Sequence, residues 1–318
     1  TLAITSSALA LLFAGAYTTG TAQYSGKSMS TLLVQGNIKQ SLRFDPSQFW
    51  TTMSKYQDLT RTHWDADLIV WPEAAVPEIE ALADSYLAGL DSAASFNKTA
   101  LITGVVDYQL DTKTIFNTLI VVGNKNKDDE HGHYRYLDKN RYQKHQLLPI
   151  GEFVPFEDLL RPIAPLFDLP MSSFTRGDKV QNNLRANGFN ILPAICYEIV
   201  FADLVRGNYQ HSSDLLFTVS NDAWFGDSIG PHQHMQIARM RALELQRPLI
   251  RVTNNGVSGV YDPISHTQQS MPQFEATTMK ADVKLIQGDS VYSQYGNMFV
   301  WGFVLLLGIG GFGIRFKR

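Results

Sequence analysis

The chain of 318 residues contains one cysteine, Cys196, and so lacks the partner that an internal disulfide would need. A single thiol is also a poor basis for a zinc site, which takes several nitrogen or sulfur ligands. What remains is an inert buried side chain or a nucleophile. Burial is the more common role of a free cysteine, so a catalytic role needs support from the residues around it.

Charge is scarce as well. Charged residues make up 18% of the chain, below the roughly 25% of soluble domains, and the net charge is −3. The chain has no basic run of the length that nucleic-acid binding needs, so no nucleic-acid partner is expected. Glycine-rich phosphate loops are missing too: the stretch 255–259 lacks the strand–loop–helix setting of a dinucleotide site.

Histidines could suggest a metal site or a cysteine–histidine pair. His131 and His133 lie in a charged loop. His232 and His234 lie near the start of a predicted helix, where residues two apart point to different sides. We therefore expect no metal at either pair. A pair of Cys196 with a histidine is not excluded by spacing, although no local signature of one surrounds it.

Both ends of the chain are apolar: residues 2–17 and 298–314 contain no charged side chain. As helices they would span about 24–26 Å, slightly short of a hydrocarbon core of about 30 Å. We predict transmembrane helices over residues 1–20 and 296–315, with a polar linker at 21–30. The alternatives are a signal-peptide core for the first segment and a buried core helix for the second.

Basic residues set the expected orientation. Arg315, Lys317 and Arg318 follow the second apolar segment, which places this end in the cytoplasm by the positive-inside rule. The region between the two segments then lies on the opposite face of the membrane. Because the chain does not begin with Met, we expect it to be the C-terminal part of a longer membrane protein.

Between the two ends, short apolar runs alternate with segments of helical periodicity. Such alternation indicates a layered α/β fold rather than a β-sandwich or a helical bundle. The predicted strands are residues 32–35, 67–71, 100–106, 117–122, 189–195, 215–220, 249–253 and 259–261, and the predicted helices are residues 47–61, 81–96 and 236–246.

Residues 153–174 (FVPFEDLLRPIAPLFDLPMSSF) combine four prolines with many Leu, Ile and Phe side chains. Proline at this density prevents one regular helix, which indicates a long apolar loop. Long ordered loops are usually lids or binding arms, and a lid that exposes Leu166 and Phe167 would suit a lipid substrate. The alternative is a loop packed over the core.

Three ionisable side chains accompany the thiol. Glu73 follows the strand at 67–71, Lys144 lies between two predicted elements, and Glu152 follows a glycine. Each alone would be expected at the surface, but functional groups in open α/β sheets gather at the carboxyl ends of strands. Together they suit nucleophilic catalysis by Cys196: a carboxylate can take the thiol proton, an ammonium can stabilise an oxyanion, and a second carboxylate can hold the ammonium.

These residues resemble the motifs of the nitrilase, or carbon–nitrogen hydrolase, superfamily. WPE at 71–73 is similar to its glutamate motif, Lys144 with GE at 151–152 to its lysine motif, and CYE at 196–198 to its cysteine motif. Longer stretches, among them QGNIKQSL, SNDAWFG, TNNGVSG and HQHMQIARMRALELQRP, resemble one membrane-bound branch, the apolipoprotein N-acyltransferases of Gram-negative bacteria. The resemblance covers about residues 31–288 and the last apolar segment.

The resemblance implies a four-layer α-β-β-α sandwich over residues 31–288, flanked by transmembrane helices, and an N-acyltransferase without cofactor or metal. Cys196 would take an acyl chain from a phospholipid, with phosphatidylethanolamine as the expected donor, and hold it as a thioester. The acceptor would be the N-terminal α-amino group of the diacylglyceryl-cysteine of an apolipoprotein. Glu73 would be the general base, Lys144 the oxyanion stabiliser and Glu152 its support.

The resemblance also implies that Tyr197 and Glu198 shape the site and that Phe44 contacts lipid. Close relatives are expected to have Trp at the position of Phe44, so this contact departs from the pattern. The enzyme would lie in the bacterial inner membrane as a multi-pass protein with its catalytic domain facing the periplasm. This chain would lack the N-terminal membrane helices.

Two other functions are compatible with the sequence. A membrane-tethered amidase of the nitrilase type would use the same Glu–Lys–Cys set, with water as the acceptor and a small amide as the substrate. A binding module without enzymatic activity would leave Cys196 inert. The apolar loop and the apolar ends favour the acyltransferase over the amidase, and the presence of all four ionisable side chains argues against the binding module.

Overall fold

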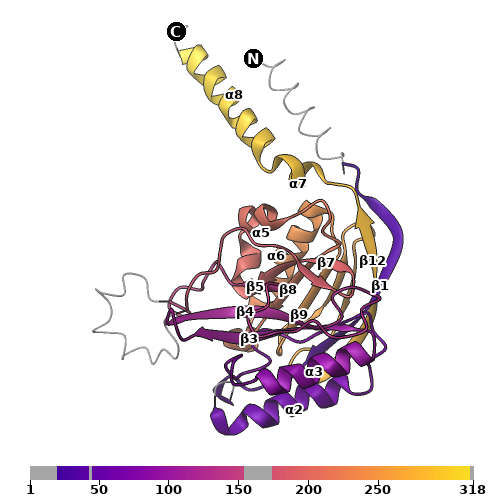
Figure 1. Ribbon diagram of the computed structural model, residues 1–318. Helices are drawn as coiled ribbons and strands as arrows, with labels where there is room; N and C mark the ends of the chain where they lie inside the picture. Colours follow the sequence, from indigo (N-terminus) through magenta and orange to yellow (C-terminus); the bar gives the residue numbers. More distant parts are fainter. Residues whose placement is uncertain (1–19, 43–44, 154–173, 316–318) are drawn as a thin grey trace, which may run out of the picture.

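The computed structural model describes residues 20–42, 45–153 and 174–315, and two six-stranded β-sheets form its centre (Figure 1). In spatial order, the first sheet contains β12 (Thr277–Gln287), β1 (Gln23–Gln35), β2 (Leu68–Val70), β3 (Ala100–Gln109), β4 (Thr114–Gly123) and β5 (Arg141–Gln143). The neighbours β1, β2 and β3 run parallel, and the other neighbouring pairs run antiparallel.

The second sheet has the same plan. In spatial order it contains β11 (Thr267–Ser270), β10 (Gly259–Asp262), β9 (Leu249–Thr253), β8 (Leu215–Ser220), β7 (Phe189–Ile195) and β6 (Leu184–Ala186). The central strands β7, β8 and β9 are parallel, with antiparallel strands at both edges. Each sheet therefore has a parallel centre, and its parallel strands end at the same edge.

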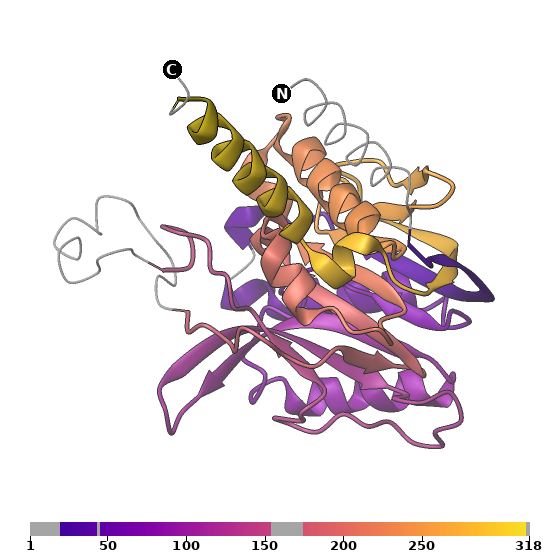
Figure 2. The same cartoon turned by 90° about the horizontal axis from the view of Figure 1, so that it is seen from above.

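Alternating side chains along the strands produce three apolar layers. In β2, Leu68 and Val70 belong to the core between the sheets, whereas Ile69 packs with the helices α2 (Phe49–Thr60) and α3 (Asp84–Phe96). In β9, Ile250 belongs to the core between the sheets, whereas Leu249 packs with α5 (Ala202–Asn208) and α6 (Gly230–Leu245). Each helix pair covers the outer face of one sheet (Figures 1 and 2), which confirms the α-β-β-α sandwich.

Some elements differ from the prediction. β1 begins at Gln23, inside the predicted linker at 21–30, and pairs with β12 from there. Its first residues are polar and largely exposed, so backbone pairing rather than an apolar pattern makes them strand, and the linker prediction is wrong for residues 23–30. The helix predicted from residue 236 begins at Gly230, because its first turn accommodates proline.

The two apolar ends are described to different extents. The transmembrane helix predicted for residues 1–20 lies outside the described residues except for Gly20. At the other end, the short helix α7 (Val291–Tyr295) leads into α8 (Met298–Arg315), which covers most of the predicted span at 296–315 and projects from the sandwich in Figure 1. Within the described part of the chain, no helix combines the length and the apolar character that crossing a membrane requires.

Candidate active site

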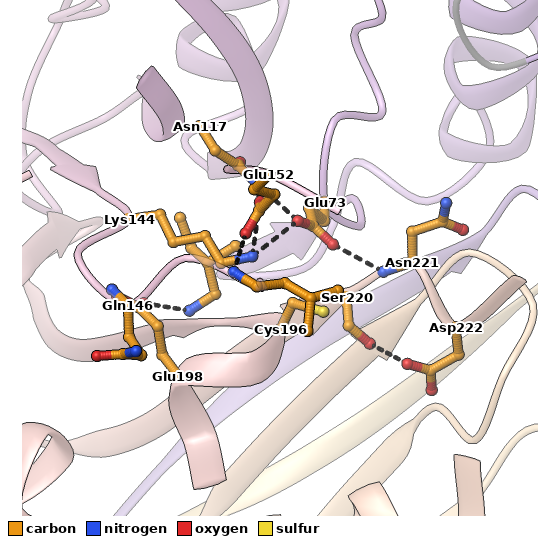
Figure 3. Close-up of polar contacts among 12 residues, drawn as sticks. Glu73, Asn117, Lys144, Gln146, Glu152, Cys196, Glu198, Ser220, Asn221 and Asp222 are labelled. Carbon is orange, nitrogen blue, oxygen red and sulfur yellow. Dashed lines mark hydrogen bonds and ion pairs between the residues drawn. The ribbon is translucent and has the colours of Figure 1, made fainter. Parts of the chain in front are cut away.

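The side chains of Glu73, Lys144 and Cys196 converge on one point at the ends of three strands (Figure 3). Glu73 follows β2 and Lys144 follows β5, both in the first sheet. Cys196 follows β7 in the second sheet and begins the short 3-10 helix η4 (Cys196–Val200). The cluster is therefore assembled from both sheets.

Glu73 accepts hydrogen bonds on both carboxylate oxygens and is only 6% exposed. Its Oε1 accepts from Asn117 Nδ2 at 2.7 Å, and its Oε2 accepts from the backbone N–H of Asn221 at 2.9 Å. Gly104 of β3 lies against the backbone of Glu73 and Ala74. A Cβ at this position would come within 2.3 Å of the backbone nitrogen of Ala74. The carboxylate thus has a set orientation, and the glycine permits the close approach of β3.

Lys144 is a buried ammonium between two carboxylates. Its Nζ donates to Glu152 Oε1 at 2.8 Å and lies 3.6 Å from Glu73 Oε1. Glu152 is fixed in turn, because its Oε2 accepts a hydrogen bond of 2.8 Å from the backbone N–H of Leu148. Buried charges are tolerated when they are paired and hydrogen-bonded, as here.

Asn117 of β4 connects the two carboxylates. Its Nδ2 donates to Glu73 Oε1 at 2.7 Å and to Glu152 Oε1 at 3.0 Å. Its backbone carbonyl accepts from the N–H of Lys144 at 2.8 Å. The sequence pattern does not mark this residue as functional, because an asparagine within a strand pattern carries no signal of its own.

Cys196 stands at a sharp change of direction. Its φ of +51° lies in the left-handed region, which costs a residue with a Cβ about 1–3 kcal/mol. The residue as a whole is half-buried, and its side chain packs against the core between the sheets. The neighbouring Tyr197 packs edge-on against Phe201, with ring centroids 5.0 Å apart.

Glu198 ties this turn to the segment that carries the lysine. Its side chain is fully buried and accepts hydrogen bonds from three backbone N–H groups, those of Ile195 at 2.8 Å, His145 at 2.7 Å and Gln146 at 3.1 Å. Ile195 precedes the cysteine, and the other two follow Lys144. The carboxylate therefore sets the position of the turn relative to the lysine.

Electrostatics favour a protonated thiol beside a charged lysine. Burial lowers the pKa of Lys144, but the carboxylates of Glu73 and Glu152 outweigh burial, so the pKa is raised and the side chain is an ammonium. Burial raises the pKa of the Cys196 thiol, and the charge of Glu73 raises it further while Lys144 opposes them. A nucleophile of this kind needs a base when it attacks, and the arrangement offers a carboxylate for the proton and an ammonium for a developing anion.

The remaining predicted residues are placed as follows. Phe44, Leu166 and Phe167 lie outside the described residues. His133 Nε2 pairs with Asp129 Oδ2 at 2.8 Å, and His234 Nε2 lies 3.0 Å from the backbone carbonyl oxygen of Cys196. In the described residues, no group of three or more His, Cys, Asp or Glu side chains could hold a metal ion.

The sequence matches the carbon–nitrogen hydrolase profile over residues 33–291, and the chain belongs to this family. It is similar to the apolipoprotein N-acyltransferase of Vibrio cholerae, at 52% identity over 277 residues, which are 86% of this chain and 54% of that protein. The apolipoprotein N-acyltransferase of Photobacterium profundum is 52% identical over 271 residues, 85% of this chain and 52% of that protein. The chain thus spans about half the length of these curated relatives.

Solved structures share the fold. Nit3 from Saccharomyces cerevisiae, a member of branch 10 of the nitrilase superfamily, has a TM-score of 0.56 at 16% identity, covering 81% of this chain and 90% of that one. A carbon–nitrogen hydrolase from Helicobacter pylori has a TM-score of 0.57 at 13% identity, covering 92% of this chain and 99% of that one. Identity this low shows the fold alone.

Proposed function

We propose that this chain is the catalytic part of an N-acyltransferase that moves a fatty acyl chain from a phospholipid to the N-terminal α-amino group of an apolipoprotein. The supporting observation is the buried cluster of Glu73, Lys144, Asn117 and Glu152 beside the thiol of Cys196. The names of the relatives that are 52% identical point to the same reaction.

In the first half of the reaction, the sulfur of Cys196 attacks the carbonyl carbon of a phospholipid acyl ester. A carbon–sulfur bond forms while the thiol proton moves to the carboxylate of Glu73. The ester carbon–oxygen bond then breaks, and the departing lysophospholipid oxygen takes the proton from Glu73. Because burial and the charge of Glu73 keep the resting thiol protonated, the step depends on this transfer to a base.

In the second half, the free α-amino group of the acceptor attacks the thioester carbon. Glu73 takes a proton from the amine as the carbon–nitrogen bond forms. The carbon–sulfur bond then breaks, and the proton returns from Glu73 to the sulfur. The acceptor leaves with an amide, and the thiol is restored.

In both halves the carbonyl oxygen carries negative charge as the tetrahedral intermediate forms. The ammonium of Lys144 supplies the stabilising positive charge. Glu152 and Asn117 hold the lysine and the base relative to each other. Glu152 Oε1 accepts hydrogen bonds from both Lys144 Nζ and Asn117 Nδ2. The preset geometry removes the need for reorganisation during the reaction.

We further propose that phosphatidylethanolamine is the donor and that the domain works at the periplasmic face of the inner membrane, held there by its apolar ends. Exposed apolar side chains on α8 support contact with lipid, among them Trp301 at 68% and Leu305 at 64% exposure. Phe44, Leu166 and Phe167 stay the predicted lipid contacts near the site. A multi-pass membrane arrangement of the whole protein belongs to the same proposal.

Intact-mass analysis after incubation with phosphatidylethanolamine vesicles tests the proposal. We expect one fatty-acyl mass on the purified chain, removable by neutral hydroxylamine, and no adduct on Cys196→Ala. A synthetic peptide that begins with diacylglyceryl-cysteine should remove the adduct and appear as its N-acyl product. An adduct that resists hydroxylamine, or one that persists without the thiol, would contradict the nucleophile. Release to water alone, with no N-acyl peptide, would favour the amidase.

A further inference from the structure

The left-handed backbone of Cys196 must be stabilised by its surroundings. The residue before the cysteine is held on two sides. Ile195 donates its N–H to Glu198 Oε2 at 2.8 Å and pairs in register with Val219 of the parallel strand β8. The peptide after the cysteine presents its carbonyl oxygen at the start of the 3-10 helix, and the side chain that contacts this oxygen is the imidazole of His234.

His234 reaches the carbonyl from the first turns of α6. Its side chain is buried, at 7% exposure, and its Nε2 lies 3.0 Å from the oxygen. The opposite nitrogen, Nδ1, lies 3.2 Å from Asp222 Oδ1, and the ring of Phe225 packs edge-on at 6.3 Å between centroids. Asp222 and Phe225 belong to the 3-10 helix η5 (Asp222–Phe225), so the imidazole connects two strand-end turns, η5 and η4.

Asp222 is itself rigidly held. Its Oδ1 accepts from Ser220 Oγ at 2.7 Å, and its Oδ2 accepts from Arg251 Nη2 at 2.8 Å. Asp222 and Arg251 are buried, and a Cβ on Gly256 would come within 2.3 Å of the aspartate oxygen. This tight enclosure fixes the carboxylate, and the carboxylate fixes the orientation of the His234 ring.

The protonation state of the His234 ring decides which of its two contacts are hydrogen bonds. A backbone carbonyl and a carboxylate only accept, so each contact needs a proton on the ring nitrogen that faces it. The protonated ring satisfies both acceptors, and the neutral ring satisfies one. Asp222 from η5 and Arg251 from β9 are the charged side chains that face the ring; burial and Arg251 lower the pKa of His234, and Asp222 opposes them.

We propose that His234 is a positioning residue for the nucleophile. Its Nε2–H holds the carbonyl oxygen of Cys196 and thereby the left-handed backbone that directs the thiol toward Glu73 and Lys144, while Asp222 holds the ring. The ring contacts the backbone of Cys196, so it acts through the conformation of the turn. This inference rests on the proposed role of Cys196 as the nucleophile.

Three substitutions separate the two contacts of the ring. His234→Gln keeps an N–H donor near the position of Nε2, His234→Asn keeps one near Nδ1, and His234→Ala keeps neither. We expect the Asn and Ala variants to lose about 10²-fold in kcat for acylation of Cys196 by a soluble short-chain ester, with KM unchanged, because a small misplacement of a reacting group costs about this much. The Gln variant should stay within about tenfold of wild type by the same argument.

Melting temperatures and a second reagent complete the test. If the Ala variant fails to fold, the comparison of Gln with Asn decides. Equal kcat in wild type and the folded Asn variant would overturn the inference, and so would a folded Gln variant as slow as Asn. As the pH rises through the pKa of the ring, the ratio of wild-type to Gln kcat should fall, and a constant ratio would also count against it. A wild-type chain that no ester acylates would contradict the proposed function instead. In that case the rate of Cys196 alkylation by iodoacetamide is compared among wild type and the His234 variants.

Discussion

At the scale of single residues, three glutamates near the thiol differ in what they bind. Glu198 accepts from three backbone N–H groups and also bonds to the Tyr142 side chain, whereas Glu152 pairs with the ammonium of Lys144. Glu73 is held by the Asn117 amide and the N–H of Asn221, and its charge acts on the Cys196 thiol. The partners, rather than the residue type, therefore distinguish the proposed base from its two supports.

Glu73→Gln should have opposite effects on two reactions of the same thiol. Acylation from phospholipid should be lost, because the amide takes no proton. The pKa of Cys196 should fall, because the charge that raises it is removed, so alkylation by iodoacetamide should reach its thiolate plateau at a lower pH than in wild type. The pH dependence of the alkylation rate measures this.

Glu130→Gln is the matched control, because it removes the same charge from an exposed loop. It should leave both reactions unchanged. Near-normal acylation in Glu73→Gln would remove this residue from the mechanism, and an unchanged alkylation profile would show that its charge does not act on the thiol.

Lys144→Met should reduce acylation by about 10²–10³-fold, the typical loss when one oxyanion donor is removed. It should also cost about 3–5 kcal/mol of stability, since the buried Glu73 and the neighbouring Glu152 are left without their cation. The double variant Lys144→Met/Glu152→Gln removes one of these charges. Thermal unfolding should show partial recovery of stability in the double variant, and acylation assays should show none. Recovery of both would mean that the lysine is only structural.

At the scale of elements, the turn at 196–198 and the segment at 144–146 are held together by one side chain. Glu198 joins them through three backbone hydrogen bonds, although Glu198 and His145 are separated by 53 positions in the chain. Neither segment is a regular helix or strand of useful length, so local propensity does not hold them. The buried carboxylate takes over that role.

Glu198→Gln places an N–H₂ group against at least one backbone donor. We expect a loss of about 1–3 kcal/mol in unfolding free energy, the penalty of a buried donor left without an acceptor. Acylation should fall as well, because the cysteine and lysine segments lose their common anchor. Chemical denaturation and the acylation rate measure the two effects, and an unchanged denaturation midpoint would contradict the anchoring role.

At the scale of the whole molecule, the sandwich places its reactive residues at the strand ends and leaves an apolar helix outside its core. Met298, Phe299, Trp301 and other large apolar side chains of α8 are exposed. Exposed apolar surface of this extent usually marks a contact with lipid or another protein. The proposed membrane setting gives this helix its partner.

Val304→Asp with Leu305→Asp should separate lipid contact from folding. Both positions are exposed, so the melting temperature of the sandwich should change little. Binding to phospholipid vesicles in a flotation assay should fall sharply, because a charged side chain in hydrocarbon costs about 2.5–3.5 kcal/mol. Gln268→Asp with Gln269→Asp on the exposed strand β11 is the control and should leave flotation unchanged. Equal flotation of both double variants would rule out α8 as a lipid contact.

Local pattern was sufficient for much of the framework. The strands at 215–220 and 249–253 have the predicted ends, because strands in the centre of a parallel sheet are buried on both faces and read as continuous apolar runs. The same pattern placed Glu73 and Cys196 at strand ends. It missed β12, whose buried and exposed side chains alternate, and the polar start of β1.

Asn117 and His234 show which contacts local sequence pattern does not predict. Asn117 bonds to glutamates 44 and 35 positions away, and His234 contacts a carbonyl 38 positions away. The sequence by itself determined the alternation of strands and helices, the family motifs and the residue types at the strand ends. Only the tertiary structure decided that Cys196 of one sheet meets Glu73 and Lys144 of the other, and that buried partners hold its left-handed backbone. Those contacts depend on strand register and on how the two sheets pack, which no local propensity specifies.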